Sequence, residues 1–390
     1  MRALKLGVAG LGRAFAVMAP AFSADPRVEL VAAADPRVEA RRRFEADFHR
    51  TTYQDVEGLC RDRIVEAVYV ATPHQLHAAH VGLACSFGKH VLVEKPMALS
   101  LEDCDAMIAA ARKAGSVLVV GHSHSFDAPI RHARKIITSG AVGRVRMISA
   151  FNYTDFLYRP RRREELDTAA GGGAVFNQAA HQVDMVRLLG GGRVRSLRAA
   201  SGAWDSARPT EGAYSALLAF EDDAFASLVY SGYAHFDSDE FMGWIGEMGQ
   251  QKDPEAYGAA RRALNGPADE LALKSARNYG GANFNPAAPS PFHQHFGVVI
   301  VSCERADLRP LTSGVMLYGD GERRLDPLPA PRLPRAEVID EFHGAIAEGR
   351  PALHSGEWAK ATLEVCLAML RSAHEGKEIA LKNQVGLPTL

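Results

Sequence analysis

The first third of the chain alternates short apolar runs with stretches of helical periodicity. The apolar runs are rich in small and β-branched residues, as is typical of parallel strands covered on both faces. They lie at residues 4–9, 28–34, 65–71, 90–94 and 117–121. Helical patterns lie between them, for example over residues 37–48 and 75–86. This alternation predicts a doubly wound α/β domain, which we place at residues 1–125.

One predicted helix carries its own start and stop signals. Ser100 and Asp103 have the spacing of a capping box, and Gly115 is suited to end the helix. The residues between them form one apolar stripe, made of Leu101, Cys104, Met107, Ile108 and Ala111. The pattern therefore predicts a helix between Ser100 and Gly115.

After Gly143 the rhythm changes to longer runs in which polar and apolar residues partly alternate. These runs predict strands at residues 145–153, 194–203, 214–220 and 225–233, with a hairpin turn at residues 221–224. Strands that pair without crossover helices give a mostly antiparallel sheet. We therefore predict that residues 126–390 form an α+β domain with an open sheet.

Two parts of this second domain stand apart from its strands. Residues 246–290 are rich in Ala, Gly, Asn and Pro, with one helical piece around 257–264, and we interpret them as an insertion that serves as a lid or an oligomer contact. Near the end, two apolar stripes predict amphipathic helices. Their members are Val338, Phe342 and Ile346, and then Leu363, Cys366, Met369 and Leu370.

Composition narrows the class of protein. A chain of 390 residues favours two domains, and 45 Lys and Arg against 46 Asp and Glu give no long-range field toward nucleic acid or an anionic membrane. The five cysteines are scattered, which indicates buried thiols in a reducing compartment and no metal site.

We find no signal peptide or membrane span, so we expect a soluble, cytoplasmic protein with a small-molecule substrate. An open sheet face needs covering, which predicts a homo-oligomer.

A dinucleotide site is indicated after the first strand. Gly10 and Gly12 let the backbone of Gly10-Leu-Gly12-Arg13-Ala14-Phe15 approach a pyrophosphate at a helix N-terminus. Phe15 departs from the usual Gly or Ala, so its ring must be housed there. Asp35 ends the second strand, where an acid binds the ribose hydroxyls, although it also suits a helix cap before Pro36. Arg37 could stack on adenine or neutralise the 2′-phosphate of NADP. Asp35 would repel that phosphate, which favours NAD and leaves NADP open.

Later motifs resemble the Gfo/Idh/MocA family of dehydrogenases. They are Val70-Ala-Thr72-Pro73-His74-Gln-Leu-His77, then Val93-Glu94-Lys95-Pro96, then Gly171-Gly-Gly-Ala-Val-Phe-Asn177-Gln-Ala-Ala-His181-Gln-Val-Asp184, and finally Ser372-Ala-His-Glu-Gly376. The resemblance spans nearly the whole chain. It implies a Rossmann domain joined to a larger open-sheet domain, with the substrate held between them.

The resemblance also implies roles for individual residues. Thr72, Pro73, His74 and His77 would border the nicotinamide side of the cofactor, and Glu94 and Lys95 would lie beside the nicotinamide. Pro96 would follow a cis peptide bond that aims Lys95 inward. His181 would be the acid or base, with Asp184 one turn on. The alternatives are that Lys95 is a surface lysine and that His181 is a locally bonded helix residue.

One position departs from the family pattern. The usual Asp four residues before the histidine is Asn177 here, and an amide cannot carry a proton or hold an imidazolium by charge. Asn177 can still orient the ring or bind a substrate hydroxyl. Either His181 works with Lys95 alone, or another acid substitutes.

Residues that follow the first strand of the second domain indicate the substrate class. Four arginines stand in five positions, Arg159, Arg161, Arg162 and Arg163, and guanidinium groups bind carboxylates bidentately. The alternative is a solvated loop balanced by Glu164, Glu165 and Asp167. Tyr153 and His124 are further candidates for contacts to hydroxyl groups. His122 and His124 alternate at a strand end, so we expect only one of them to face the cleft, without a metal.

These residues suggest a hydride transfer from a secondary alcohol, in which Lys95 polarises the oxygen and His181 takes its proton. Within the family, residues 121–127, the arginine stretch and residues 244–249 are most similar to phthalate cis-dihydrodiol dehydrogenases. That similarity implies oxidation of 4,5-dihydro-4,5-dihydroxyphthalate. The alternatives are a sugar or inositol dehydrogenase and a non-catalytic NAD(H)-sensing protein.

Overall fold

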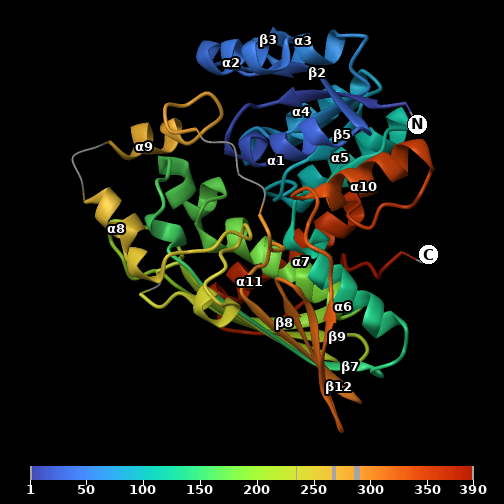
Figure 1. The fold of residues 1–390 in the computed structure, drawn as a ribbon, viewed down its shortest axis with the longest axis vertical. Helices are drawn as coiled ribbons and strands as arrows, with labels where there is room; N and C mark the ends of the chain where they lie inside the picture. The colour runs from blue at the N-terminus through green and yellow to red at the C-terminus, as the bar shows by residue number, and fades with distance from the viewer. Residues whose placement is uncertain (1, 234, 266–268, 285–289, 389–390) are drawn as a thin grey trace.

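The computed structural model describes residues 2–233, 235–265, 269–284 and 290–388. It contains two β-sheets, with the N-terminal sheet and its helices at the top of Figure 1 and the larger sheet at the bottom. This arrangement confirms the predicted order of a Rossmann-type domain followed by an α+β domain.

The N-terminal sheet has six parallel strands in the order β3-β2-β1-β4-β5-β6. The strands are β1 (Leu4–Ala9), β2 (Val28–Ala34), β3 (Thr51–Tyr53), β4 (Ala67–Val70), β5 (His90–Val93) and β6 (Leu118–Val120). Five of them were predicted; β3 was missed because three partly exposed residues make no apolar run. The strand order reverses between β1 and β4, which opens a crevice at the carboxyl ends of these strands.

Helices cover both faces of this sheet. They are α1 (Arg13–Ala24), α2 (Val38–Phe48), α3 (Val56–Arg61), α4 (His77–Ser86) and α5 (Leu101–Ala114). The predicted signals of α5 are confirmed, because the Ser100 hydroxyl accepts the Asp103 N–H at 3.1 Å and Gly115 ends the helix with φ +63°.

The second sheet has nine strands in the order β14-β13-β12-β11-β7-β10-β9-β8-β15. The strands are β7 (Val145–Tyr153), β8 (Val194–Gly202), β9 (Ala213–Phe220), β10 (Phe225–Ser231), β11 (Val298–Cys303), β12 (Ala306–Leu311), β13 (Gly314–Gly319), β14 (Arg323–Pro327) and β15 (Ile379–Ala380). Only β7 and β10 pair in parallel, so the prediction of a mostly antiparallel sheet is confirmed. The predicted hairpin joins β9 and β10.

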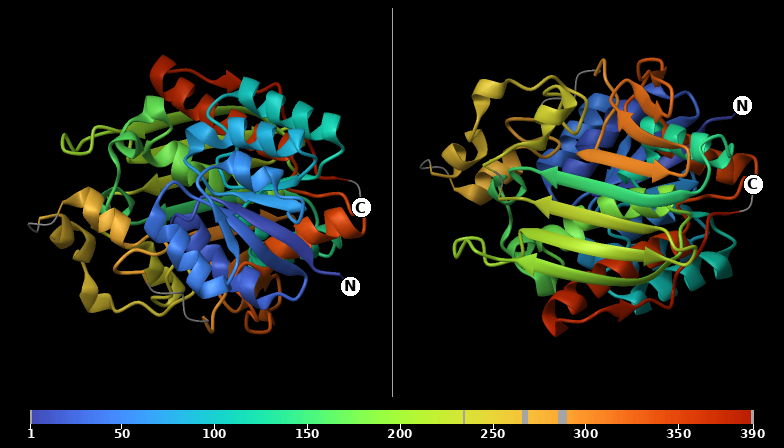
Figure 2. Two further views of the ribbon diagram at one scale, coloured as in Figure 1. Left: turned by 90° about the horizontal axis from the view of Figure 1, so that it is seen from above. Right: turned by 90° about the horizontal axis from the view of Figure 1, so that it is seen from below.

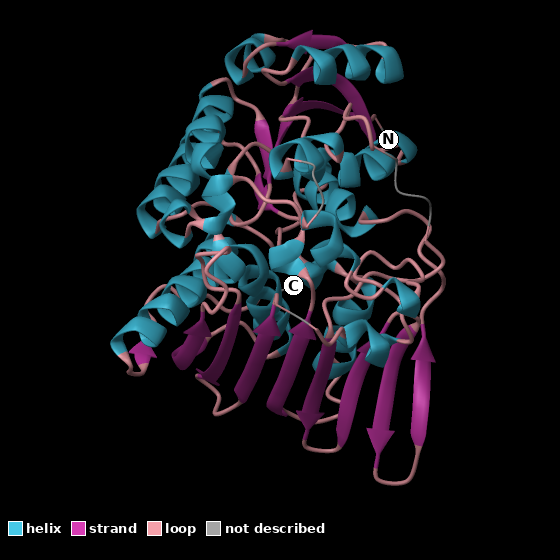
Figure 3. Ribbon diagram, turned by 90° about the vertical axis from the view of Figure 1, so that its left-hand side faces the viewer, coloured by secondary structure: helices cyan, strands magenta, loops and turns pink. Residues whose placement is uncertain are grey.

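One face of the second sheet carries helices and the other is open. Figure 3 shows helices on one side of the strands of this sheet, and in the right-hand view of Figure 2 the strands face the viewer with helices behind. The helices that contact the sheet include α6 (Ala128–Thr138), α7 (Ala180–Leu189) and α11 (Gly356–Glu375). The open face exposes Met147, Leu217 and Phe225 by 37, 53 and 43%. An exposed apolar sheet face suits a subunit contact. The homo-oligomer stays a prediction.

The C-terminal part of the chain returns to the N-terminal domain. Helix α10 (Ala336–Ala347) contributes Val338, Ile339 and Phe342 to the core beneath α1, and the carbonyl of His354 accepts the N–H of Val120 at 2.9 Å. The predicted boundary at residue 125 stays a prediction, but α10, which we assigned to the second domain, packs on the first. None of the helices in the described ranges combines the length and apolar character needed to cross a membrane.

The predicted insertion also reaches the N-terminal domain. It carries α8 (Ala259–Leu264) and α9 (Glu270–Ala276), and its residues 266–268 and 285–289 lie outside the described residues. After α9, Tyr279 is 1% exposed, and its ring centroid lies 4.9 Å from that of Phe15. Phe44 and Phe48 complete this aromatic cluster. The Phe15 ring, at the position where the usual motif has Gly or Ala, therefore packs between α2 and the insertion.

We expect that removing the Tyr279 ring releases residues 269–284 from the N-terminal domain. Truncating a buried aromatic ring costs about 3–5 kcal/mol, so Tyr279→Ala should raise the rate of tryptic cleavage at Lys274 or Arg277 about 100-fold. Tyr279→Phe is the matched control, because it loses only the bond from the hydroxyl to Asp47 (2.7 Å), worth about 1 kcal/mol. Equal cleavage rates in wild type and Tyr279→Ala would show that this segment is not anchored here.

Candidate cofactor and substrate site

A groove of about 700 Å³ runs along the carboxyl ends of the N-terminal strands. The wall on the N-terminal domain is made of predicted cofactor residues, namely Gly10, Gly12, Arg13, Ala14, Asp35, Arg37, Thr72, Pro73 and His74. Gly10 has φ +96°, and a side chain there would meet the carbonyl oxygen of Ala71 at 2.8 Å. A side chain at Gly12 would meet nothing within 4 Å, so the backbone is open to a ligand on that side. The glycine turn therefore fits a pyrophosphate.

Four of the predicted cofactor residues, Phe15, His77, Glu94 and Lys95, are not among those that line the groove. Phe15 and His77 are fully buried, and Glu94 is 9% exposed. The His77 ring is held between the carbonyl oxygens of Pro96 (3.0 Å) and Thr72 (2.9 Å). The described contacts of these residues therefore position the wall, and their contact with the cofactor stays a prediction.

Asp35 and Arg37 form one unit at the end of β2. Asp35 accepts the N–H of Leu11 at 2.8 Å and the Arg37 Nε at 3.0 Å, and the Arg37 guanidinium also donates to the Leu11 carbonyl at 2.7 Å. The arginine charge is therefore already neutralised by a buried carboxylate. This arrangement leaves little positive charge for a 2′-phosphate and agrees with the preference for NAD.

The insertion forms the opposite side of the groove. Lys274, Ser275 and Asn278 line it, and Arg162, predicted to bind substrate, lines it as well. The Arg162 Nε pairs with Glu164 at 3.0 Å. The structure thus places Arg162 with the cofactor residues. It also favours the lid interpretation of residues 246–290 over an oligomer contact, within the part that is described.

The amino group of Lys95 is fixed by a bond to the backbone that follows the glycine-rich turn. The Lys95–Pro96 peptide is cis, as the resemblance implied, and the Lys95 Nζ donates to the backbone carbonyl of Asn177 at 2.9 Å. The pKa of Lys95 is lowered to about 8, chiefly because the amino group is removed from solvent; the charges of Arg335 and Arg161 add to this lowering, and those of Glu94 and Glu247 oppose it. Lys95 can therefore change its charge near neutral pH.

Asn177 contacts Lys95 through its backbone, not its side chain. It lies in a π-helical turn, Val175–Ala179, which precedes α7, and such turns are frequent at functional sites. Its side-chain amide donates to the carbonyl of Gly173 at 2.8 Å. The amide thus stabilises the glycine turn, which agrees with the prediction that no proton relay runs through this position.

His181 lies in a cage of rings at the start of α7. Its ring centroid is 4.8 Å from that of His124 and 5.2 Å from that of Phe296. Its Nδ1 is buried without a hydrogen-bond partner among the described residues. Burial, and next the charge of Lys95, lower the pKa of His181 well below its ordinary value. The ring is therefore neutral at neutral pH and able to accept a proton.

His122 and His124 both bind the carboxylate of Asp127. The His124 Nδ1 lies 2.6 Å from one carboxylate oxygen, and the His122 Nε2 lies 3.3 Å from the other. Our prediction that only one histidine could face this way was wrong. Strand β6 ends at Val120, and the chain enters a short 3₁₀ helix, His124–Phe126, so side chains no longer alternate. The sequence analysis also missed Asp127, which orients His124 as a carboxylate orients a catalytic histidine.

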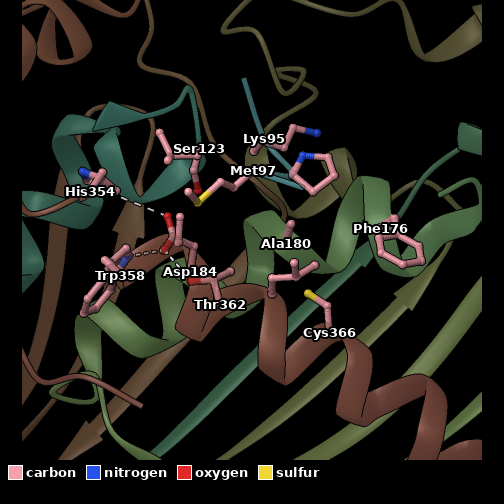
Figure 4. A pocket seen from close by; sticks show the side chains of 14 residues that line it. Lys95, Met97, Ser123, Phe176, Ala180, Asp184, His354, Trp358, Thr362 and Cys366 are labelled. Carbon is pink, nitrogen blue, oxygen red and sulfur yellow. Dashed lines mark hydrogen bonds and ion pairs between the residues drawn. The ribbon is translucent and has the colours of Figure 1, made fainter. Parts of the chain in front are cut away.

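Asp184, expected beside His181, is a structural anchor. It accepts hydrogen bonds from the indole N–H of Trp358, the Thr362 hydroxyl and the Ser125 hydroxyl. Figure 4 shows Asp184 directed toward Trp358, whereas the amino group of Lys95 points away from it. Ser125 also bonds His354 at 2.7 Å. The described contacts thus give Asp184 a role in joining α7 to α11.

The arginine stretch does not act as one cluster. Arg159 pairs with Asp155 at 2.8 Å and Glu247 at 3.5 Å, and Arg163 is exposed. Arg161 is different: its side chain is 11% exposed and its guanidinium lies 4.0 Å from the nearest carboxylate, Glu165. Burial lowers the pKa of Arg161 to about 10. Its guanidinium donates to the Phe156 carbonyl at 2.7 Å and lies 3.7 Å from the centroid of the Phe156 ring, so this buried cation has no carboxylate in close contact, which suits an anionic ligand.

Tyr153, the remaining predicted substrate residue, is not brought to this cluster in the described structure. Side chains alternate along β7, so the Tyr153 ring packs on Phe236 with centroids 5.7 Å apart, while neighbouring Asn152 reaches Glu247 at 3.3 Å. Glu247 and Arg335, whose charges act on Lys95, were both missed. Residues 244–249 carried a signal for Glu247, but nothing in the pattern marked Arg335.

Comparison with known proteins agrees with this geometry. Residues 4–122 match the oxidoreductase family with an NAD-binding Rossmann fold, and residues 130–250 match the GFO/IDH/MocA C-terminal domain. The chain is 49% identical over 94% of its length to a 1-carboxy-3-chloro-3,4-dihydroxycyclo hexa-1,5-diene dehydrogenase from Comamonas testosteroni, covering 94% of that protein.

Two further proteins extend the comparison. A dTDP-3,4-didehydro-2,6-dideoxy-alpha-D-glucose 3-reductase from Streptomyces violaceoruber is 31% identical, with 66% of this chain and 74% of that protein covered. The crystal structure of a dehydrogenase from Bordetella bronchiseptica superposes with a TM-score of 0.92 at 44% identity, with 97% of this chain and all of that chain covered. The chain therefore belongs to the Gfo/Idh/MocA family of NAD-dependent oxidoreductases.

Proposed function

We propose that the protein oxidises a carboxylated cis-dihydrodiol, with NAD as the hydride acceptor. The observation that carries this proposal is Arg161, a buried cation whose nearest carboxylate lies 4.0 Å away, and whose charge reaches Lys95. A substrate carboxylate would supply the missing counter-charge. The name of the Comamonas testosteroni relative, which describes a carboxylated dihydroxycyclohexadiene, supports the same substrate class.

The way in which the arginines are already paired indicates how many carboxylates of a substrate they can bind. Arg159 is already shared between Asp155 and Glu247, and Arg162 pairs with Glu164. Arg161 is thus the one arginine of the described stretch that is both buried and weakly paired. This arrangement suits one carboxylate better than the two of 4,5-dihydro-4,5-dihydroxyphthalate, which remains a candidate substrate of the same class.

Different residues of the chain bind the cofactor, take the proton and stabilise the negative charge. NAD, held by the glycine turn and Asp35, supplies the hydride acceptor when bound. Neutral His181 takes the proton of the reacting hydroxyl, and protonated Lys95 stabilises the negative charge that grows on that oxygen. The carbinol hydrogen leaves with its electron pair as hydride, and residues 274–278 cover the groove against water.

The alternatives fit these residues less well. A sugar or inositol substrate would leave Arg161 buried without an anion, at a cost in stability. A non-catalytic NAD(H)-sensing protein would need neither a lysine fixed on the Asn177 carbonyl nor a neutral His181 beside it. NADP would meet the Asp35 carboxylate. We therefore keep the carboxylated cis-dihydrodiol and NAD as the proposal.

Replacing Arg161 tests the substrate class. Arg161→Met should lower kcat/KM for a carboxylated cis-dihydrodiol about 100-fold, chiefly through KM, because a charged pair is lost in a buried site. The same variant should change kcat/KM for the uncarboxylated diol less than about threefold. Arg163→Met, in the same loop but exposed, is the matched control. Equal losses on both diols, or wild-type turnover on sugars or inositol alone, would contradict the proposal.

The pH dependence tests the role of Lys95. Because its pKa is lowered to about 8, Lys95 is charged below that pH and neutral above it, so kcat/KM should fall as the pH rises through about 8. Lys95→Arg keeps the charge and, because a guanidinium titrates above about pH 12, should move this alkaline limb up by several pH units, whatever its absolute rate. Lys95→Met should bind NADH and lose turnover. Normal turnover in Lys95→Met, or an unmoved limb in Lys95→Arg, would rule out this role.

A further inference from the structure

Glu247 is presented to the site by a tight turn. The N–H of Gly249 donates to the carbonyl of Gly246 at 2.7 Å, and the N–H of Gly246 donates to the carbonyl of Gln250 at 2.8 Å. The Glu247 carbonyl accepts the N–H of His295 at 3.2 Å. The next residue is Phe296, whose ring packs against both His124 (5.0 Å) and His181 (5.2 Å). The turn is therefore fixed to the wall that holds the two histidines.

The Glu247 carboxylate has unused capacity to accept hydrogen bonds. One oxygen accepts the Asn152 amide at 3.3 Å and the other pairs with the Arg159 guanidinium at 3.5 Å. Both distances exceed the usual 2.9 Å, and an ionised carboxylate has about four acceptor positions. The side chain is 18% exposed, so the free positions are accessible.

The charge of Glu247 and its neighbours determines which kind of hydrogen-bond donor the carboxylate can accept from. Burial acts to raise its pKa, but Arg159, His124 and His295 hold that pKa below the ordinary value, so the carboxylate is ionised at neutral pH. It repels a substrate carboxylate, which Arg161 attracts. Because Arg159 neutralises part of its charge, a neutral donor suits it better than a cation. A hydroxyl group is such a donor.

Lys95 lies within electrostatic reach of both charges. Arg161 acts to lower its pKa and Glu247 acts to raise it. A substrate whose reacting oxygen reaches Lys95 would therefore come within the influence of one cation and one carboxylate. A carboxylated ring with two adjacent hydroxyl groups has the matching order of groups.

We propose that Glu247 accepts a hydrogen bond from the hydroxyl adjacent to the reacting one, and so selects vicinal diols over single alcohols. This assignment rests on the proposed function, because it names the second contact of the same substrate. In this assignment Glu247 supplies a carboxylate to a site in which the usual Asp is replaced by Asn177. The Glu247 carboxylate binds the non-reacting hydroxyl, and the proton of the reacting hydroxyl goes to His181.

The test compares ligands that differ by one hydroxyl group. Full-length protein loaded with NAD is titrated by calorimetry with 3,4-dihydroxybenzoate, 3-hydroxybenzoate and 4-hydroxybenzoate. In parallel, KM and kcat are measured for a carboxylated cis-dihydrodiol and for the matching alcohol without the second hydroxyl. The variant is Glu247→Gln, and the control is Asp155→Asn, which removes the other carboxylate from Arg159. Thermal unfolding confirms that both variants are folded.

We expect wild type to bind the dihydroxy acid about 10- to 100-fold more tightly than either monohydroxy acid, the usual loss when a charged acceptor is left unpaired. Glu247→Gln should reduce this preference to about threefold or less, and should raise KM for the diol but not for the alcohol. Asp155→Asn should leave the preference intact. An unchanged preference in Glu247→Gln, or an equal loss in Asp155→Asn, would overturn the assignment.

The two proposals fail in different ways. If wild type oxidises no carboxylated diol but binds the dihydroxy acid through Glu247, the proposed function is wrong, while Glu247 is still the acceptor that selects two adjacent hydroxyl groups. If wild type oxidises the diol and Glu247→Gln leaves KM unchanged, the function stands and the assignment is wrong.

Discussion

The buried carboxylate of Asp184 is the contact on which the site's geometry depends. A charge removed from water must be compensated by hydrogen bonds, and Asp184 takes them from Ser125, Trp358 and Thr362. These donors come from the end of the N-terminal sheet and from α11, while Asp184 itself lies on α7. One residue therefore fixes the helix that carries His181 against the turn that carries His124. The bond from Ser125 to His354, and from His354 to Glu341 at 3.0 Å, extends this network to α10.

The sequence predicted those parts of the fold that local pattern determines. Five of the six parallel strands, the cap at Ser100 and the hairpin between β9 and β10 each depend on a few consecutive residues, and these were found. Strands β11 and β13 are short apolar runs that we did not assign. Strands β12 and β14 were missed because charged residues and Pro310 interrupt their alternation, and both are strands because they pair with β13. Site residues were missed for the same reason, because they come near one another only in the folded chain. Arg335 acts on Lys95 by its charge from a position 240 residues away in the sequence, and no local pattern marks that proximity.

The departure at Asn177 changes how the site's charge is arranged. Its backbone carbonyl holds the lysine, while the histidine four residues on has no carboxylate of its own and remains neutral. The carboxylates near the two histidines are those of Asp127, which bonds His124, and of Glu247, which bonds Asn152 and acts on His124 by its charge. Lys95, Arg161 and Arg335 bring positive charge to the same place. Such a site favours an anionic substrate and the negative oxygen that forms during alcohol oxidation.

The ring at position 15 has a consequence for protein engineering. Dinucleotide motifs carry Gly or Ala here, and a consensus design would restore it. In this chain, Phe15 is the surface on which Tyr279 rests, so the restored motif would lose the contact that holds the insertion over the groove. The helix that we expect to receive the pyrophosphate thus also anchors the segment that lines the opposite side of its groove. A substitution that improves the match to the family would make cofactor exchange faster and the bound cofactor more exposed to solvent.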